Sequence, residues 1–300
     1  MKLPKLNLLI ICFLFLGILV NSGCKKHRDK VEPGTEDPED PDNENNMDFL
    51  SQDVEIFFSS GKFNPSDNGF FCGLSTIDST TKSIWKISFN GTSCNSKKKR
   101  EGMIIISIEK GTRWEDKGAI MSVQFINYKV TDLSTNRTVE MVGTQKIMNE
   151  TGGSIVNMID NKLVHVIRTI GLKYFFDGKP KTINEAKRRT FYKVGIDYHI
   201  ENSGDTIIKG YPYPDVAEWG TTVKLIPYQV SYLEPLIANT CGGKTKFISG
   251  KKFHKSSSSG TTTIYGVTRD GDLDHTCDAW GYKVTWIDKS DVTNKRIYKY

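Results

Sequence analysis

The chain has no apolar run long enough to cross a membrane as a helix, and it lacks the short motifs that mark common catalytic sites. Its longest apolar run, Leu8–Val20, has 13 residues, whereas a helix needs about 20 to span a hydrocarbon core of about 30 Å. No G-x-S-x-G elbow, H-E-x-x-H, phosphate-binding loop or dinucleotide fingerprint is present. We therefore expect no membrane-spanning helix in the mature chain, and no catalytic activity can be read from a motif.

Proline and glycine are too scarce for a collagen-like or low-complexity chain, with 10 and 26 residues among 300. The hydrophobic share of 37% is too high for a wholly disordered protein, and the net charge of +6 is mild. This composition predicts an ordinary folded protein with one large domain or two modest ones.

Metal-ligand patterns are also missing. There is no C-x-x-C pair and no His at zinc-ligand spacing. Asp270, Asp272 and Asp274 alternate as calcium ligands can, but an EF-hand loop needs Gly at its sixth position and Glu at its twelfth, where His275 and Gly281 stand. We interpret this segment as a solvated turn, and the sequence predicts no metal and no cofactor.

The N-terminus has the layout of a secretory signal. Lys2 and Lys5 precede the apolar run, and the residues NSG lead directly to Cys24. Small residues before a cysteine at this place resemble the lipobox of bacterial lipoproteins. The resemblance implies removal of residues 1–23 as a signal peptide and attachment of a diacylglycerol to Cys24, so that the chain is anchored to a membrane rather than spanning it.

Residues 24–47 predict a disordered tether. The segment Glu32–Asn46 reads EPGTEDPEDPDNENN, with seven acidic residues and no aromatic one, and it cannot bury enough apolar surface to fold. Without the signal and the tether, the domain of residues 48–300 carries 35 basic and 27 acidic residues. A basic domain is thus expected on an acidic stalk.

The domain shows alternation with a period of two. Apolar residues alternate with polar ones in Trp85–Phe89, Met121–Phe125 and Tyr282–Trp286, which indicates strands with one buried face. Only Thr182–Arg189 allows one or two helical turns. We predict a mainly β fold of antiparallel sheets, as a sandwich, a barrel or an extended meander, with room for two related β subdomains divided near residues 155–240. Turn signals separate the expected strands, at Asn90-Gly91, Gly152-Gly153, Asp177-Gly178, Ser203-Gly204 and Asp270-Gly271.

Four cysteines remain in the domain, and an even count in an exported protein suggests disulfides. The order of elements around Cys72 and Cys94 is repeated around Cys241 and Cys277, with 22 and 36 residues between the cysteines. If this echo reflects a duplication, the pairs are Cys72–Cys94 and Cys241–Cys277. Cross-paired bridges and free thiols are the alternatives.

Three features are candidates for binding or chemistry. Tyr211, Tyr213 and Trp219 form a possible sugar-stacking patch, although aromatic residues in a β protein are more often part of the core. The run Lys97–Arg100 reads as a solvated loop that can touch anionic polysaccharide or lipid head groups. We interpret His165, on one strand face with apolar neighbours, as a core residue.

Several segments resemble uncharacterised β-rich lipoproteins of Bacteroidota-type bacteria. They are NSGCKK at the signal, Gly111–Gly153, AEWG at Ala217–Gly220, CGG at Cys241–Gly243 and SGKK at Ser249–Lys252. The resemblance implies export to the outer membrane, facing the periplasm or the outside, and it assigns no activity. It also implies O-glycosylation at D-[ST]-x motifs, which places candidate sites at Ser79 and Thr206.

From these features we expect a membrane-anchored envelope lipoprotein, held in lipid through Cys24, whose domain is a non-catalytic binding or structural module. Its partners would be a glycan or an envelope protein, not nucleic acid. The alternative is a polysaccharide-directed hydrolase in which Asp215 or Glu218 works beside Trp219.

Overall fold

A computed structural model describes residues 74–81, 83–90, 98–108, 113–133, 136–155, 158, 162–195, 197–241, 244–257, 259–288 and 290–300. Within these ranges the chain forms antiparallel β-strands and no helix, so the predicted mainly β fold is confirmed. The predictions for residues 1–47, and those for Cys72 and Cys94, lie outside the described residues.

Fourteen strands make up the described fold, and most of them are joined by short turns. The strands are β1 (Leu74–Asp78), β2 (Ile84–Asn90), β3 (Lys98–Ile108), β4 (Ala119–Asp132), β5 (Arg137–Asn149), β6 (Leu163–Phe176), β7 (Lys179–Val194), β8 (Asp197–Gly204), β9 (Val216–Thr221), β10 (Pro227–Cys241), β11 (Lys244–Ser256), β12 (Gly260–Val267), β13 (Gly281–Ile287) and β14 (Thr293–Lys299).

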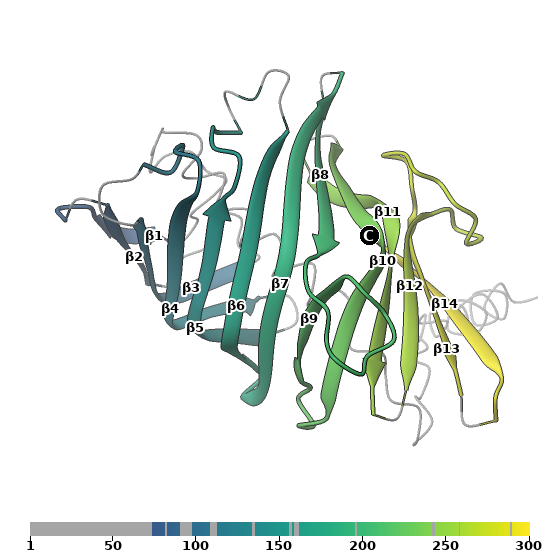
Figure 1. Ribbon diagram of the computed structural model, residues 1–300. Coiled ribbons are helices and arrows are strands. Elements are labelled where there is room, and N and C mark those ends of the chain that lie inside the picture. Colours follow the sequence, from purple (N-terminus) through teal and green to yellow (C-terminus); the bar gives the residue numbers. More distant parts are fainter. Residues whose placement is uncertain are drawn as a thin grey trace, which may run out of the picture. The chain divides into compact units, whose positions relative to one another are not determined.

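All of these strands belong to one sheet, arranged as an extended meander (Figure 1). Each strand from β1 to β7 pairs with the next, β8 pairs with β10, and each strand from β10 to β13 again pairs with the next. Strand β9 is the exception, because it lies between β10 and the first part of β7, while β8 pairs with the later part of β7. Strand β7 therefore has two different neighbours along one edge.

Two glycines make room for β9. A Cβ atom on Gly220 would lie 1.9 Å from the carbonyl oxygen of Thr182 in β7. One on Gly204, at the end of β8, would lie 1.7 Å from the carbonyl oxygen of Asp215, just before β9. Such distances are far inside van der Waals contact, so only glycine permits these close approaches of the backbone.

The predicted helical turns at Thr182–Arg189 are wrong, because the whole segment lies inside β7. The apolar residues Ile183 and Phe191 share the buried face of β7 with charged residues. The sequence therefore lacks the alternation of apolar and polar residues by which a strand is recognised. The predicted turn at Ser203-Gly204 is also wrong, since both residues end β8.

The apolar core is divided into two clusters on the inner face of the sheet. The first is built from β2 to β7 and includes Ile104, Met121 and Ile147, all fully buried. The second lies mainly on β8 to β13 and includes Tyr265, Tyr282 and Val284. Each buried aliphatic or aromatic side chain stabilises the fold by about 1.5–3 kcal/mol. Between the two clusters, the middle strands bury polar and charged side chains instead.

Candidate functional site

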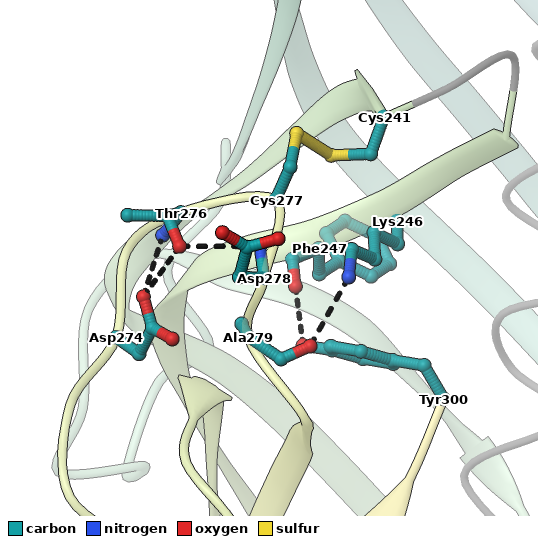
Figure 2. Close-up of a disulfide and its surroundings, with 9 residues drawn as sticks. All are labelled: Cys241, Lys246, Phe247, Asp274, Thr276, Cys277, Asp278, Ala279 and Tyr300. Atoms are coloured by element: carbon teal, nitrogen blue, oxygen red, sulfur yellow. Dashed lines mark hydrogen bonds between the residues drawn. A yellow bond between two sulfur atoms is a disulfide. The ribbon is translucent and has the colours of Figure 1, made fainter.

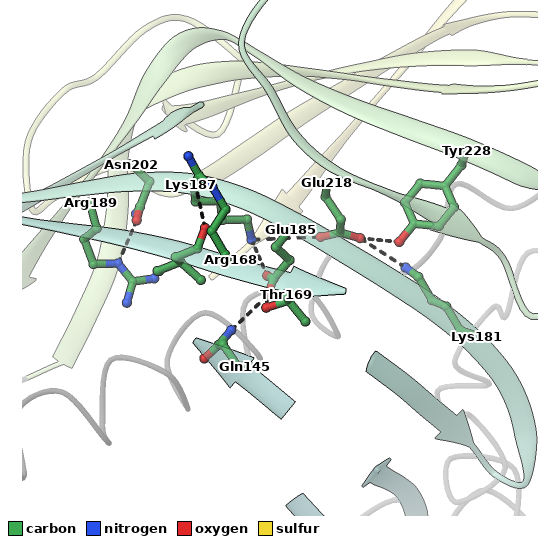
Figure 3. A network of polar contacts seen from close by, with 11 residues as sticks. Gln145, Arg168, Thr169, Lys181, Glu185, Lys187, Arg189, Asn202, Glu218 and Tyr228 are labelled. Atoms are coloured by element: carbon green, nitrogen blue, oxygen red, sulfur yellow. Dashed lines mark hydrogen bonds and ion pairs between the residues drawn. The ribbon is translucent and has the colours of Figure 1, made fainter. Parts of the chain in front are cut away.

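A row of polar side chains crosses the inner face at the middle of the sheet. Gln145 of β5, Thr169 of β6, Glu185 of β7 and Glu218 of β9 stand directly opposite one another in successive strand pairs. All four are nine-tenths or more buried. One Glu185 oxygen accepts hydrogen bonds from Gln145 Nε2 and Thr169 Oγ1, both at 2.8 Å (Figure 3). The row is therefore tied together by side chains as well as by the backbone.

Two buried lysines complete this inner cluster, which we define as Glu185, Lys187, Glu218, Lys181 and Tyr228. Lys187 Nζ lies 2.9 Å from Glu185 and 3.9 Å from Glu218, and Lys181 Nζ lies 3.8 Å from Glu218 (Figure 3). The Tyr228 hydroxyl donates a hydrogen bond to Glu218, and its ring lies 4.6 Å from the Lys181 ammonium. Two cations and two carboxylates thus neutralise one another out of contact with water.

Burial raises the pKa of Glu218 above its ordinary value of 4.5, and the nearby Glu185 charge adds to that rise. Lys181, Lys187 and the Tyr228 hydrogen bond act in the opposite direction and lower the pKa. Loss of hydration is the largest of these effects, because a carboxylate in a low-dielectric interior loses the water that stabilises its charge.

A second polar row runs parallel to the first. Asn149, His165, Arg189 and Asn202 stand opposite one another on β5, β6, β7 and β8, and each is at most 2% exposed. Arg189 Nε donates to Asn202 Oδ1 at 2.8 Å. The His165 ring makes edge contacts with two aromatic side chains, which fits its interpretation as a core residue.

The outer face of β7 carries a second set of ion pairs. We call it the outer chain, and it comprises Glu150, Arg168, Arg188 and Asp205. Arg188 Nη1 lies 2.6 Å from Glu150, Arg188 Nε lies 3.6 Å from Asp205, and Asp205 also pairs with Arg168. These side chains are between 24% and 45% exposed. Water screens such pairs, so they contribute little to stability.

A loop over residues 205–215 connects β8 to β9 and closes on itself. Asp205 N–H donates to the Val216 carbonyl, and Val216 N–H donates back to the Thr206 carbonyl at 3.0 Å. The Tyr211 and Tyr213 rings meet edge to face at 5.6 Å, and Tyr213 packs at 4.8 Å against Phe253 of β11. The loop therefore lies against β11, with its aromatic side chains only partly exposed.

We call Tyr211, Tyr213 and Phe253 the outer aromatic cluster. Trp219 is also partly exposed, one residue after the buried Glu218 on β9 and so on the opposite face of that strand. The structure thus brings together two of the three predicted stacking residues and adds Phe253. Burial raises the pKa of the Tyr211 hydroxyl, which the nearby Ser231 hydroxyl partly offsets.

The predicted Cys241–Cys277 disulfide is present, with a Cα–Cα distance of 5.3 Å (Figure 2). It ties the end of β10 to the loop before β13. Beside it, Lys246 Nζ donates to the Ala279 carbonyl at 3.1 Å, and the Tyr300 hydroxyl donates to the Phe247 carbonyl and accepts from Gly266 N–H. Burial raises the pKa of Tyr300 to about 12. The bridge and these bonds fasten one corner of the sheet.

The candidate modification sites differ in exposure. Ser79 is exposed after β1, where Asp78 accepts hydrogen bonds from the backbone and side chain of Thr80. Thr206 is partly buried, and its neighbour Asp205 is held in the outer chain. Both remain predictions, and Ser79 is the more accessible of the two.

Two other sequence features have ordinary structural surroundings. In the basic run, Lys99 pairs with Glu101 at 2.8 Å along β3. In the acidic turn, Asp274 accepts hydrogen bonds from the backbone and the side chain of Thr276. Among the described residues, no three His, Cys, Asp or Glu side chains come together in a way that could hold a metal ion. The same part of the chain contains no helix long and apolar enough to cross a membrane.

Sequence reasoning missed the inner cluster except for Glu218. Its partners come from strands that are distant in the sequence, but one signal was available. Lys181, Glu185, Lys187 and Arg189 occupy odd positions in phase with Ile183. In a strand this phase places all of them on the face that buries Ile183.

No protein-family model, no curated protein and no solved structure matches this chain.

Proposed function

We propose that this chain is a lipid-anchored, non-catalytic module of a bacterial cell envelope, whose outer aromatic cluster binds a glycan. The proposed anchor is Cys24, and the proposed location is the outer membrane, facing the periplasm or the outside. The signal and tether sequences support the anchor, and a mainly β domain of basic charge is compatible with a binding role at such a surface.

The observation that carries the non-catalytic assignment is the engagement of Glu218. A glycosidase needs two carboxyl groups that both face the sugar, about 5–10 Å apart according to mechanism. Glu218 is 5% exposed and held by two lysines and a tyrosine hydroxyl, whereas Asp215 is exposed at the end of a surface loop. The two carboxylates considered for hydrolysis therefore do not face a common substrate, and we do not favour the hydrolase alternative.

The binding role rests on the outer aromatic cluster. Partly exposed tyrosine rings offer an apolar face on which a sugar ring can stack. The Tyr211 hydroxyl itself is buried, so the rings rather than this hydroxyl would make the contact. Here they are held by a loop whose two ends are hydrogen-bonded together, so the ordering entropy of the loop is already lost before a ligand binds. Trp219 adds a further aromatic side chain on the outer face.

The anchor is tested by growing cells with an alkyne fatty acid and comparing the chain with its Cys24→Ala variant. We expect label and membrane fractionation in the unsubstituted chain and neither in the variant. A variant that is still labelled and still sediments with membranes would show that the anchor assignment is wrong.

The binding role is tested by glycan arrays and by pull-downs from envelope extracts with the full chain. We expect Tyr213→Ala to lower glycan retention by at least tenfold, about 1.4 kcal/mol, because it removes the ring between Tyr211 and Phe253. Tyr192→Ala is the matched control, since Tyr192 is a partly exposed tyrosine stacked on His199 instead. Equal loss in both variants, or turnover abolished by one substitution, would refute the proposal.

A further inference from the structure

The turn between β9 and β10 holds a leucine in a conformation that leucine rarely adopts. Leu225 has a φ of +61°. Among the described residues, the other non-glycine positions with positive φ are five Asn or Asp residues and one Ser. Short polar side chains tolerate this left-handed region, whereas a bulky apolar one is strained there by about 1–2 kcal/mol. Asn or Asp at this position would be the ordinary choice for the fold.

The turn that contains Leu225 is closely hydrogen-bonded, and these bonds hold the backbone of Leu225 in the left-handed region. Thr222 N–H donates to the Ile226 carbonyl at 2.9 Å, and Leu225 N–H donates to the Thr222 carbonyl at 2.8 Å. The Thr222 hydroxyl also accepts from the backbone N–H groups of Lys224 and Ile226. The turn therefore presents Leu225 outward in one fixed conformation.

The Leu225 side chain does not pack into the core, so burial of apolar surface does not offset the backbone strain. It is 66% exposed, and the adjacent Lys224 is exposed as well. An exposed apolar side chain at a strained position is a reason to infer a contact made outside the domain.

A second apolar turn lies at the same end of the sheet. Ile287 and Val292, which flank the β13–β14 turn, are 61% and 54% exposed. Strand register places this turn and the β9–β10 turn at one end, along the lower edge of the sheet in Figure 1. Strand β1 also begins at this end. Leu74 pairs with Phe89 near the end of β2, and the antiparallel pairings from β2 to β7 and on to β9 connect that end to the β9–β10 turn. The described chain thus enters the sheet on the side of these turns.

We infer that these two turns contact the lipid bilayer to which the chain is anchored, with Leu225 as the main contact residue. This inference depends on the proposed lipid anchor. The two turns lie four strand spacings apart, about 19 Å along the sheet, and the β11–β12 turn lies between them. A small rigid groove does not enclose both, whereas a bilayer is a continuous and deformable apolar surface. An aliphatic side chain beside a lysine suits its interface, with the leucine among the acyl chains and the ammonium among the head groups.

The inference is tested on the full chain, acylated and reconstituted in vesicles of phosphatidylethanolamine and phosphatidylglycerol. The fluorophore NBD is attached to a cysteine introduced by Leu225→Cys. We expect a blue shift and about a twofold rise in emission in vesicles over detergent-free buffer, because the probe leaves water. Val194→Cys is the matched control, since Val194 is 54% exposed as the last residue of β7, at the opposite end of the sheet. The unsubstituted chain, labelled in parallel, gives the background from native thiols.

A second variant separates contact from folding. In Leu225→Asn, the thermal midpoint should stay equal or rise, because Asn tolerates the left-handed region. At the same time, the emission gain of a probe at Val292→Cys should fall by about half, because one of two apolar contacts is lost. A lower midpoint with an unchanged probe signal would mean that Leu225 serves the fold and not the bilayer.

The two proposals fail in distinguishable ways. If Cys24 carries lipid but the probe at Leu225 stays in water, the anchor stands and the bilayer contact is overturned. If Cys24 carries no lipid, the labelled chain is added to the same vesicles; a blue shift there keeps the contact and rejects the anchor, and no shift rejects both. A blue shift produced by envelope proteins or by self-association, but not by vesicles, also overturns the contact.

Discussion

Strand β7 carries ion pairs on both of its faces, and two neighbouring residues show how different they are. Lys187 points inward, with 4% of its side chain exposed, and lies 2.9 Å from Glu185. Arg188 points outward, with 38% exposed, and lies 2.6 Å from Glu150. The distances are similar, but one pair has lost its water and the other has kept it.

Distance alone therefore does not determine how much an ion pair contributes to the free energy of unfolding. A buried charge that loses its partner keeps its full desolvation cost, about 3–5 kcal/mol. An exposed charge that loses its partner returns to water at little cost. Substitutions in the inner cluster should therefore strongly destabilise the middle strands, whereas substitutions in the outer chain should change stability little.

The largest expected effect is at Lys187. Replacing it in Lys187→Met leaves Glu185 and Glu218 buried with less compensation, so the free energy of unfolding should fall by about 3–5 kcal/mol. Urea unfolding followed by tryptophan fluorescence measures this. Adding Glu185→Gln removes one of the two carboxylates and should recover part of the loss. A single-variant loss below about 1 kcal/mol would place the inner pair in the same class as exposed ones.

The next largest effect is expected in the pH dependence of stability that Glu218 causes. Because burial raises its pKa above 4.5, the folded state holds this proton more tightly than the unfolded chain does. Its contribution to stability is therefore full below pH 4.5 and is lost as pH rises through the folded pKa. In Glu218→Gln this decline should disappear from the urea midpoints measured between pH 4 and 8. An unchanged slope would mean that Glu218 is ionised without penalty.

Arg188 should give a much smaller effect. Arg188→Gln removes two exposed pairs, with Glu150 and Asp205, and should lower the free energy of unfolding by about 0–1 kcal/mol. The difference from the unsubstituted chain should shrink further in concentrated salt, because screening removes what the pairs contribute. A loss as large as that of Lys187→Met would remove the contrast between the two faces.

The smallest expected effect is at Asp288, in the β13–β14 turn. Hydrogen bonds from the Asn294 side chain and from the backbone N–H groups of Val292 and Ser290 hold its pKa below 3.8. Its contribution is present above pH 3.8 and is lost as pH falls through the folded pKa, which is the opposite direction to Glu218. Asp288→Asn should therefore flatten the acid side of the thermal midpoint curve. Equal acid sensitivity in both chains would contradict this.

The strands could be predicted from sequence where one face was consistently apolar. Trp85–Phe89, Met121–Phe125 and Tyr282–Trp286 all lie inside strands of the structure. The prediction failed at Thr182–Arg189 because alternation is read from apolar residues, and there the buried face is charged. Burial of that face depends on partners in other strands, which a local pattern does not contain.

The site could be predicted only in its local part. Tyr211 and Tyr213 are close in sequence, and their contact could be expected, whereas Phe253 follows them by 40 residues and reaches them only through the pairing of β10 with β11. The Cys241–Cys277 pair was reached through the repeated order of elements, not through geometry. Glu218 was considered only as a catalytic carboxylate, whereas the structure buries it and pairs it with Lys181 and Lys187 in the inner cluster.

The position of β9 has a consequence for the order in which the chain folds. Nearly every other strand pairs with a sequence neighbour, so hairpins can form one after another along the chain. The inner cluster cannot form until β9 has closed against β7 across the whole of β8 and the following loop. We expect the conservative substitution Glu218→Gln to change the unfolding rate and not the folding rate, with a φ-value near zero. The charged centre of the sheet would then be its last part to become native, and the first to open when the fold is stressed.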